Sequence, residues 1–285
     1  MMQQGDKVAI VCCSNGEPKS YQEKLEHLHD ILTKIDLVPV WSDYIYEQDS
    51  VFSGTARQRA ESLMNFYQDD EIKAIFDISG GDIANEILPY LDFEVIAKSD
   101  KQFWGYSDLT TIINAIYAKT GKTSVLYQIR NMLYDHADRQ IEDFSNTVMY
   151  QQMDLLDFEY HFLQGQQMQG VVIGGNIRCL LKLAGTPYMP DFTNKILLLE
   201  AYGGGVAQMV TYLSQLQQLG AFEKAAGILL GTFTKMMQEQ QEPTIYDLIK
   251  QYAGDDMPIV YTTQIGHGTD SRAIVVGEEV NLTKI

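Results

Sequence analysis

The sequence FWGYSDLT at residues 103–110 joins a short aromatic strand to the start of a helix. The aromatic run ends at Gly105, and apolar residues then recur at the spacing of an amphipathic helix: Leu109, Ile112, Ile113, Ile116 and Tyr117. Gly121 follows at the position where a left-handed residue commonly closes a helix. Ser107 is therefore predicted to lie at a strand-to-helix junction, where the first N–H groups of a helix have no intrahelical acceptor.

Two roles are open for Ser107. A hydroxyl at such a junction is exposed and lies near amides that can stabilise an oxyanion, which makes Ser107 a candidate nucleophile. A serine before a helix also commonly serves as its N-cap. The surrounding residues do not match the G-x-S-x-G motif of lipases, because Leu109 stands where the second glycine would be.

Strands and helices alternate on both sides of this stretch. Apolar runs at residues 7–13, 37–41 and 73–78 predict buried strands, and the periodic segments between them predict helices. Such alternation predicts a parallel sheet covered by helices. After a polar segment at 130–169, which we interpret as a terminal helix and a crossover, a second alternating set begins at 170–173.

We therefore predict an α/β protein with two domains. Residues 1–150 form an N-terminal parallel-sheet domain that carries the nucleophile at a strand–helix turn. Residues 151–168 form a crossover linker, and residues 169–285 form a C-terminal α/β domain. A chain of 285 residues is long enough for two such cores.

Composition and charge exclude several classes of protein. The formal net charge of −17 argues against a nucleic-acid or anionic-membrane surface, since both attract clustered Lys and Arg. We find no export signal and no apolar run of membrane-spanning length, so we expect a soluble protein. Cys12, Cys13 and Cys179 are too few for a disulfide framework and are expected to be packed free thiols. The histidines show no metal spacing, and we expect neither a metal nor a cofactor.

Three reactive residues fall at the ends of predicted strands. Ser107 follows the aromatic run, Glu200 ends the apolar run at 196–200, and His267 follows the strand at 258–261. Ligands of parallel α/β sheets gather beyond the carboxyl ends of the strands. A serine hydroxyl needs a base such as imidazole to take its proton, and a carboxylate fixes the imidazole tautomer and stabilises its charged form.

Each of these residues also has an ordinary explanation. Ser107 can be a cap, Glu200 can be a salt-bridged residue at a strand end, and His267 can be a histidine of a loop. Spacing alone does not show that the three side chains converge.

Several short motifs occur in the order in which they are found in the LD-carboxypeptidase family of serine peptidases. These motifs are GYSD at residues 105–108, GGN at 174–176, GTP at 185–187, the strand at 196–200 and GHG at 266–268. GDKV at 5–8, FSGT at 52–55 and LPYLD at 88–92 are similar to the same family. The chain thus resembles this family over nearly its whole length.

The resemblance implies a serine carboxypeptidase with the catalytic triad Ser107, Glu200 and His267. Members of this family cleave the bond between an L- and a D-residue in murein peptides, usually releasing D-alanine from the tetrapeptide in the cytoplasm. A related branch, the microcin C immunity peptidases, cleaves an amide in an aminoacyl-nucleotide antibiotic. Family members are commonly dimers, so the resemblance implies a cytoplasmic homodimer that acts on a small peptide or a peptide-nucleotide.

This chemistry requires donors for the oxyanion that forms when the serine attacks. The backbone N–H of Asp108 and one from Gly80 or Gly81 are the candidates, and a simple tight turn is the alternative role of the glycine pair. Asn176 is a candidate for orienting the substrate, with helix capping as its alternative.

The sequence departs from the family near the expected substrate. Ser79 stands where many members have an arginine before the glycine pair, and Ala201 stands where a second acidic residue often follows the triad glutamate. These departures leave open an inactive relative that serves as a ligand-binding module. GGG at residues 203–205, before a predicted helix, is an alternative phosphate cradle. A hydrolase that uses the adjacent cysteine pair lacks an identifiable histidine partner.

Overall fold

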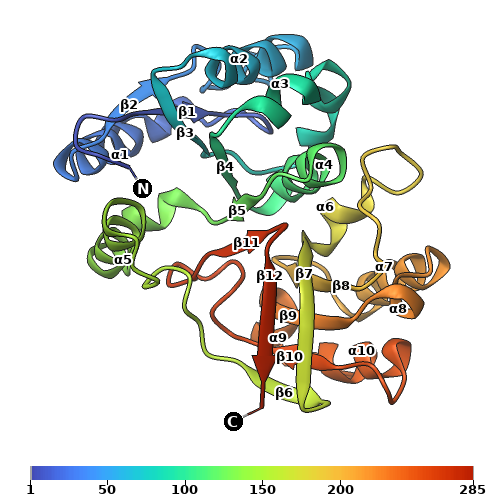
Figure 1. The fold of residues 1–285 in the computed structure, drawn as a ribbon. Helices are drawn as coiled ribbons and strands as arrows, with labels where there is room; N and C mark the ends of the chain where they lie inside the picture. Colours follow the sequence, from blue (N-terminus) through green and yellow to red (C-terminus); the bar gives the residue numbers. More distant parts are fainter. Residues whose placement is uncertain (1, 285) are drawn as a thin grey trace.

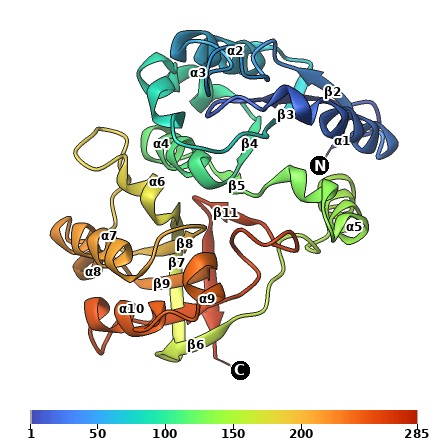
Figure 2. The same ribbon diagram turned by 180° about the vertical axis from the view of Figure 1, so that it is seen from behind.

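The computed structural model describes residues 2–284 as an α/β protein with two six-stranded sheets (Figure 1). This architecture confirms the predicted fold class. The N-terminal half, coloured blue to green, packs against the C-terminal half, coloured yellow to red, in both views (Figures 1 and 2). Within residues 2–284, no helix combines the length and the apolar composition that a membrane span needs.

The N-terminal sheet is parallel except for one edge strand. Its strands, in spatial order, are β11 (Ile274–Val276), β5 (Ser124–Leu126), β4 (Gln102–Gly105), β3 (Ile72–Asp77), β1 (Lys7–Val11) and β2 (Val38–Trp41). Only β11 runs antiparallel to its neighbour.

Alternate residues of each central strand serve opposite faces of the sheet, because side chains along a strand point to the two sides in turn. Val8 and Ile10 of β1 face α1 (Gln22–Lys34) and α5 (Ala137–Tyr150). Ala9 and Val11 face the other layer of helices, which consists of α2 (Ala56–Gln68), α3 (Phe93–Lys98) and α4 (Thr110–Thr120).

The C-terminal sheet has an antiparallel strand at each edge. Its strands, in spatial order, are β12 (Glu279–Thr283), β7 (Gln167–Asn176), β8 (Lys195–Ala201), β9 (Gly227–Phe233), β10 (Ile259–Tyr261) and β6 (His161–Gln164). Its helices are α6 (Ile177–Leu181), α7 (Val206–Gln218), α8 (Ala221–Lys224), α9 (Thr234–Gln238) and α10 (Ile245–Ala253). One face packs on α6, α7 and α10, and residues of the other face join the core of the N-terminal half.

Two segments cross the expected domain boundaries. β6 lies within the predicted linker 151–168 and pairs antiparallel with β10. β11 comes from the segment assigned to the C-terminal domain, yet it pairs with β5 of the N-terminal sheet. The buried side chains of Ile274 and Val276 explain this placement, because they complete the apolar core beside β5 and cover an edge that would otherwise be open.

Short 3-10 helices span several segments beside or between the α-helices: Lys19–Tyr21, Ala84–Tyr90, Ser107–Leu109 and Ile129–Leu133. Pro89 lies inside the second of them, and its missing N–H disfavours a continuous α-helix there. Gly121 ends α4 with a φ of +71°, in agreement with the predicted left-handed cap.

Candidate active site

Ser107 lies directly after β4 in a sharp turn. Its φ of +53° is in the left-handed region, which a non-glycine residue adopts only at an energetic cost. Its hydroxyl does not cap α4, whose N-cap residue is Leu109. The Ser107 Oγ lies 3.1 Å from Nε2 of His267.

His267 lies in the loop after β10 and connects the serine to Glu200. Its Nδ1 is 2.6 Å from Oε2 of Glu200, which is fully buried in β8. Thr232 at the end of β9 fixes this loop, because its Oγ1 accepts a hydrogen bond of 3.2 Å from the His267 N–H. A Cβ on Gly266 would lie 1.9 Å from the same oxygen, so only glycine fits beside Thr232. The structure thus brings the three predicted residues together.

Two tyrosine rings contact the imidazole. The ring centroids of Tyr106 and Tyr202 lie 4.6 and 5.1 Å from that of His267. Tyr106 is buried, whereas Tyr202 is 64% exposed. These contacts restrict rotation of the His267 ring and keep its two nitrogens directed toward Ser107 and Glu200.

The glycine pair lies in the loop after β3, next to the loop after β1. The N–H of Asn15 donates to the carbonyl of Gly80, and the Asn15 Oδ1 accepts a hydrogen bond of 3.0 Å from the N–H of Asp82. Gly81 has a φ of +116° and lines the cavity that contains Ser107. Gly80 is not among the residues that line this cavity, which makes Gly81 the stronger of the two candidates for an oxyanion donor.

The side chain of Asp108 connects neighbouring loops, a role that its position in the sequence did not reveal. Its side chain is fully buried and accepts hydrogen bonds from the Ser14 hydroxyl (2.7 Å) and the Ala84 N–H (2.9 Å). It also forms an ion pair with Lys182. The residue after Ser107 therefore joins the loops that follow β1 and β3 to the end of α6.

Asn176 acts as the N-cap of α6 and also lines the cavity. Its Oδ1 accepts a hydrogen bond of 3.3 Å from the Cys179 N–H, and its own N–H donates to the Thr110 hydroxyl. In the parallel pairing of β7 and β8, Asn176 is the register partner of Glu200. The amide is therefore next to the candidate site, but its side-chain oxygen is used by the helix.

The cavity has a volume of about 500 Å³ and contains residues that sequence reasoning missed. They are Asp82, Arg178, Gln208 and Tyr212. Arg178 donates to the Asp82 carboxylate and to the Gly81 carbonyl, the latter at 3.0 Å. Its position two residues after the GGN motif was the available signal.

The charges in this cavity are coupled. The hydrogen bond from Arg178 holds the pKa of Asp82 below its usual range, and the positive charges of Arg178 and Lys182 act in the same direction. Burial lowers the pKa of Arg178, but the bond to Asp82 and nearby negative charges outweigh this and raise it. Both groups are therefore ionised near neutral pH.

The cysteine pair lies beneath the site and is not available for catalysis. Burial raises the pKa of both Cys12 and Cys13 well above that of a free thiol, and the charge of Asp77 adds to the effect. Asp77 accepts hydrogen bonds from the N–H groups of Cys13 and Ser79. The pair therefore serves the packing below the loops, as predicted for free thiols.

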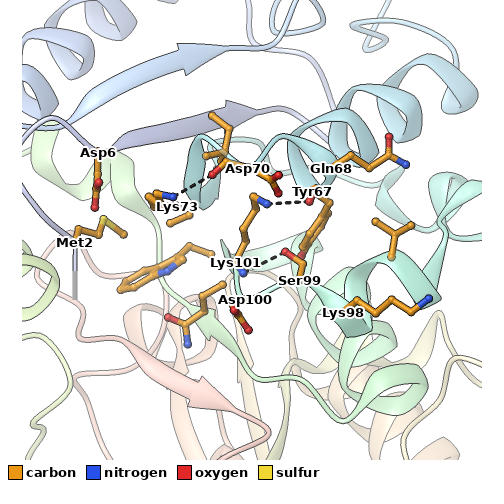
Figure 3. A pocket seen from close by; sticks show the side chains of 15 residues that line it. Met2, Asp6, Tyr67, Gln68, Asp70, Lys73, Lys98, Ser99, Asp100 and Lys101 are labelled. Carbon is orange, nitrogen blue, oxygen red and sulfur yellow. Dashed lines mark hydrogen bonds between the residues drawn. The ribbon is translucent and has the colours of Figure 1, made fainter.

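A larger cavity of about 670 Å³ lies beyond the amino ends of β1, β3 and β4 (Figure 3). Its Lys73 and Lys101 donate to the backbone carbonyls of Asp70 and Tyr67. It contains no nucleophile paired with a base, so it does not compete with the site at Ser107. Across residues 2–284, no group of three or more His, Cys, Asp or Glu is arranged to hold a metal ion.

Two family models match the chain. The LD-carboxypeptidase N-terminal domain matches residues 8–127, and the LD-carboxypeptidase C-terminal domain matches residues 169–282. A probable murein peptide carboxypeptidase of Bacillus subtilis is 26% identical over 288 residues, which cover 97% of this chain and 88% of that protein.

Two solved structures share the fold. MccF in complex with glutamyl sulfamoyl guanosine superposes with a TM-score of 0.87 at 21% identity, over 99% of this chain and 94% of that one. The muramoyltetrapeptide carboxypeptidase of Oxalobacter formigenes superposes with a TM-score of 0.80 at 22% identity, over 98% of this chain and 95% of that one.

Proposed function

Because the chain belongs to the LD-carboxypeptidase family, whose two domain models together match most of it, we propose that it cleaves the L,D-peptide bond of murein peptides and releases a terminal D-alanine. The observation that carries this proposal is the hydrogen-bonded series from the Ser107 Oγ through both nitrogens of His267 to Glu200, at 3.1 and 2.6 Å. A nucleophile, a base and an orienting carboxylate in this order are the requirements for acyl transfer.

The proposed reaction has two steps. The Nε2 of His267 takes the Ser107 proton while the serine oxygen attacks the scissile carbonyl, and Glu200 stabilises the imidazolium. The imidazolium then donates that proton to the leaving amine, and the C–N bond breaks to give an acyl-serine. A water molecule, deprotonated by His267, attacks the ester and releases the shortened peptide.

We assign the oxyanion donors to backbone amides. The N–H of Asp108 follows the nucleophile directly, and the loop at Gly81 lines the same cavity. Loss of one such donor typically lowers the rate by about 10² to 10³-fold. Support for Asp108 comes from its buried side chain, which three partners hold in position.

A second candidate is cleavage of the amide in an aminoacyl-nucleotide. Two aromatic side chains of the cavity, the exposed Tyr202 and the half-buried Tyr212, support it, because accessible aromatic rings stack on nucleobases. The candidates differ in their leaving groups, a free amino acid in one case and a nucleoside sulfamate in the other.

The test incubates the purified protein with murein tetrapeptide and, separately, with a glutamyl sulfamoyl nucleoside, and measures the products by mass spectrometry. Release of D-alanine by the wild type but not by Ser107→Ala is the expected result. Cleavage of the glutamyl sulfamoyl nucleoside, but not of the tetrapeptide, would favour the second candidate. Turnover that survives Ser107→Ala would contradict the assigned nucleophile, and no turnover of either substrate would favour a binding role.

The proposal extends to assembly and location. By its resemblance to the family, we expect a homodimer that acts in the cytoplasm on peptides from murein recycling. Light scattering on the purified chain tests the dimer, since the mass of one chain is 32.3 kDa.

A further inference from the structure

Two basic side chains of α6 and its C-terminal end reach across to the N-terminal half. Lys182 pairs with the carboxylate of Asp108 and donates to the carbonyl of Asp82 at 2.7 Å. Arg178, one turn earlier, donates to the Asp82 carboxylate and to the Gly81 carbonyl. Both cations therefore reach the loop that carries the proposed oxyanion donor.

The two ion pairs differ in how easily another anion can replace the aspartate. The side chain of Lys182 is 18% exposed and its partner Asp108 is fully buried, so breaking this pair would leave a buried charge without compensation. The side chains of Arg178 and Asp82 are 41% and 63% exposed. Solvent screens an ion pair this exposed, so another anion can replace Asp82 at little cost.

Arg178 is also the only Lys or Arg side chain among the described residues that line the cavity with Ser107 and His267. A carboxypeptidase substrate carries a free carboxylate on its leaving residue, three bonds from the scissile carbonyl carbon. The net charge of −17 repels such an anion, which makes a local cation necessary. The planar guanidinium matches a carboxylate with two parallel hydrogen bonds.

We propose that Arg178 exchanges Asp82 for the terminal carboxylate of the substrate and thereby restricts cleavage to the last residue of the peptide. This inference rests on the proposed peptidase function. It also bears on Ser79, which stands where many family members have an arginine before the glycine pair. Arg178, from the C-terminal half, places a positive charge beside this same loop. Arg178 is thus a specificity residue.

The test compares two peptides, the murein tetrapeptide and the same peptide with a C-terminal amide. We expect the wild type to prefer the free acid in kcat/KM by about 10- to 100-fold, the range expected for hydrogen bonds to a charged group. In Arg178→Gln the preference should fall toward one, mainly through a higher KM for the free acid. Arg57→Gln, which removes an exposed arginine with an exposed acidic partner elsewhere, is the matched control and should keep the wild-type preference.

A binding measurement separates this inference from the proposed function. In the Ser107→Ala background, calorimetry should show tighter binding of the free acid than of the amide, and Arg178→Gln should abolish the difference. Asp82→Asn, which removes the competing carboxylate, should tighten free-acid binding by about 2- to 5-fold. If the wild type turns over neither peptide, the proposed function fails, while calorimetry still decides the role of Arg178. Equal or absent binding of the two peptides, a preference retained in Arg178→Gln, or weaker binding by Asp82→Asn would overturn the inference.

Discussion

Ser107 adopts a backbone conformation that a capping serine does not need. A left-handed residue directly after a strand turns the chain sharply, so the hydroxyl lies beyond the carboxyl end of β4 and points toward the imidazole of His267. A strained backbone conformation persists only where the packing and hydrogen bonds around it hold it in place, and it is frequent at catalytic nucleophiles. The strain and the hydrogen bond both favour the nucleophile over the cap.

Glu200→Gln should separate orientation of the histidine from folding. The amide removes the negative charge opposite Nδ1 of His267, at 2.6 Å in the wild type, and favours the wrong tautomer. We expect kcat to fall by about 10⁴-fold, as in the analogous change in serine proteases, which leaves the geometry of the triad intact. The melting temperature should change little, because glutamine has nearly the shape of glutamate. Steady-state kinetics and calorimetry measure both. A loss below tenfold would remove Glu200 from the mechanism.

The three thiols should be inert in the native protein. Burial, with nearby carboxylates, raises the pKa of Cys12, Cys13 and Cys179 above 9.0, so the thiolate is scarce at pH 8. We expect iodoacetamide to label them only after denaturant is added. Because the folded pKa values exceed those of the unfolded chain, their stabilising contribution is lost as the pH rises beyond about 9. Rapid native labelling that abolishes activity would revive the cysteine alternative.

At the residue scale, the residues proposed to carry out the chemistry were easier to predict from the sequence than the residues that surround them in the cavity. Ser107, Glu200 and His267 could be proposed because each is a reactive residue at or beyond the end of an apolar strand and lies in a segment that resembles the LD-carboxypeptidase family. Arg178 was missed because a basic residue early in a helix usually faces solvent. Its position two residues after the GGN motif was a weak signal, and the packing of α6 against the opposite loop gives it its partner.

The loop after β3 is the element that shapes the cavity wall beside Ser107. A Cβ on Gly81 would lie 2.2 Å from the side chain of Asn15, whereas a Cβ on Gly80 would meet no atom within 4 Å. Asn15 cannot simply move away, because its Oδ1 holds the N–H of Asp82. The two adjacent glycines therefore differ sharply in what they tolerate.

Gly81→Ala should destabilise the protein and reduce activity, while Gly80→Ala serves as its control. The positive φ of Gly81 and the clash with Asn15 should lower the free energy of unfolding by about 1–3 kcal/mol. Gly80→Ala, with open space at its Cβ, should stay within about 0.5 kcal/mol. Chemical denaturation measures both variants. Equal effects at the two positions would mean that the loop relaxes and that its conformation is not fixed.

At the scale of elements, the sequence predicted the alternation of strands and helices but not every helix type. Periodic apolar residues identify a helical segment, and they do so equally for the 3-10 helix Ala84–Tyr90. Pro89 was the signal for its irregularity. The strand β6 was missed because it lies at a sheet edge, where its burial is intermediate and its pattern weak.

The two halves of the molecule are joined by the segment that follows His267. Arg272 forms an ion pair with Asp143 of α5 and donates to the Asp154 carbonyl. Ser271 accepts a hydrogen bond of 3.0 Å from Asn131, and β11 then completes the N-terminal sheet. The same loop that positions the imidazole therefore ties the C-terminal half to the N-terminal core.

Arg272→Gln should weaken the whole molecule. It leaves the nearly buried Asp143 with only the exposed Arg139 as a partner, and we expect a loss of about 3 kcal/mol in the free energy of unfolding. Arg57→Gln, at an exposed pair, should cost less than about 1 kcal/mol. Calorimetry should show one cooperative transition for the wild type, because a continuous core spans both halves. Two separate transitions, or equal effects of the two variants, would contradict this view.

At the scale of the whole molecule, the sequence predicted two domains but placed the segment of β11 in the C-terminal one, whereas it pairs with the N-terminal sheet. A three-residue apolar strand near the end of the chain fits either sheet by pattern alone. Its pairing with β5 depends on which edge is open after both halves have folded, and that is a property of tertiary packing.

The central claim is that Ser107 and His267 act as one chemical unit. It is tested most directly by comparing kcat/KM for Ser107→Ala, His267→Ala and the double variant on the cleaved substrate. We predict that each single variant loses at least about 10⁴-fold and that the double variant loses less than about tenfold more, because residues of one unit are not additive. Losses that multiply in the double variant, or a His267→Ala enzyme that keeps more than about a tenth of the activity, would contradict the claim.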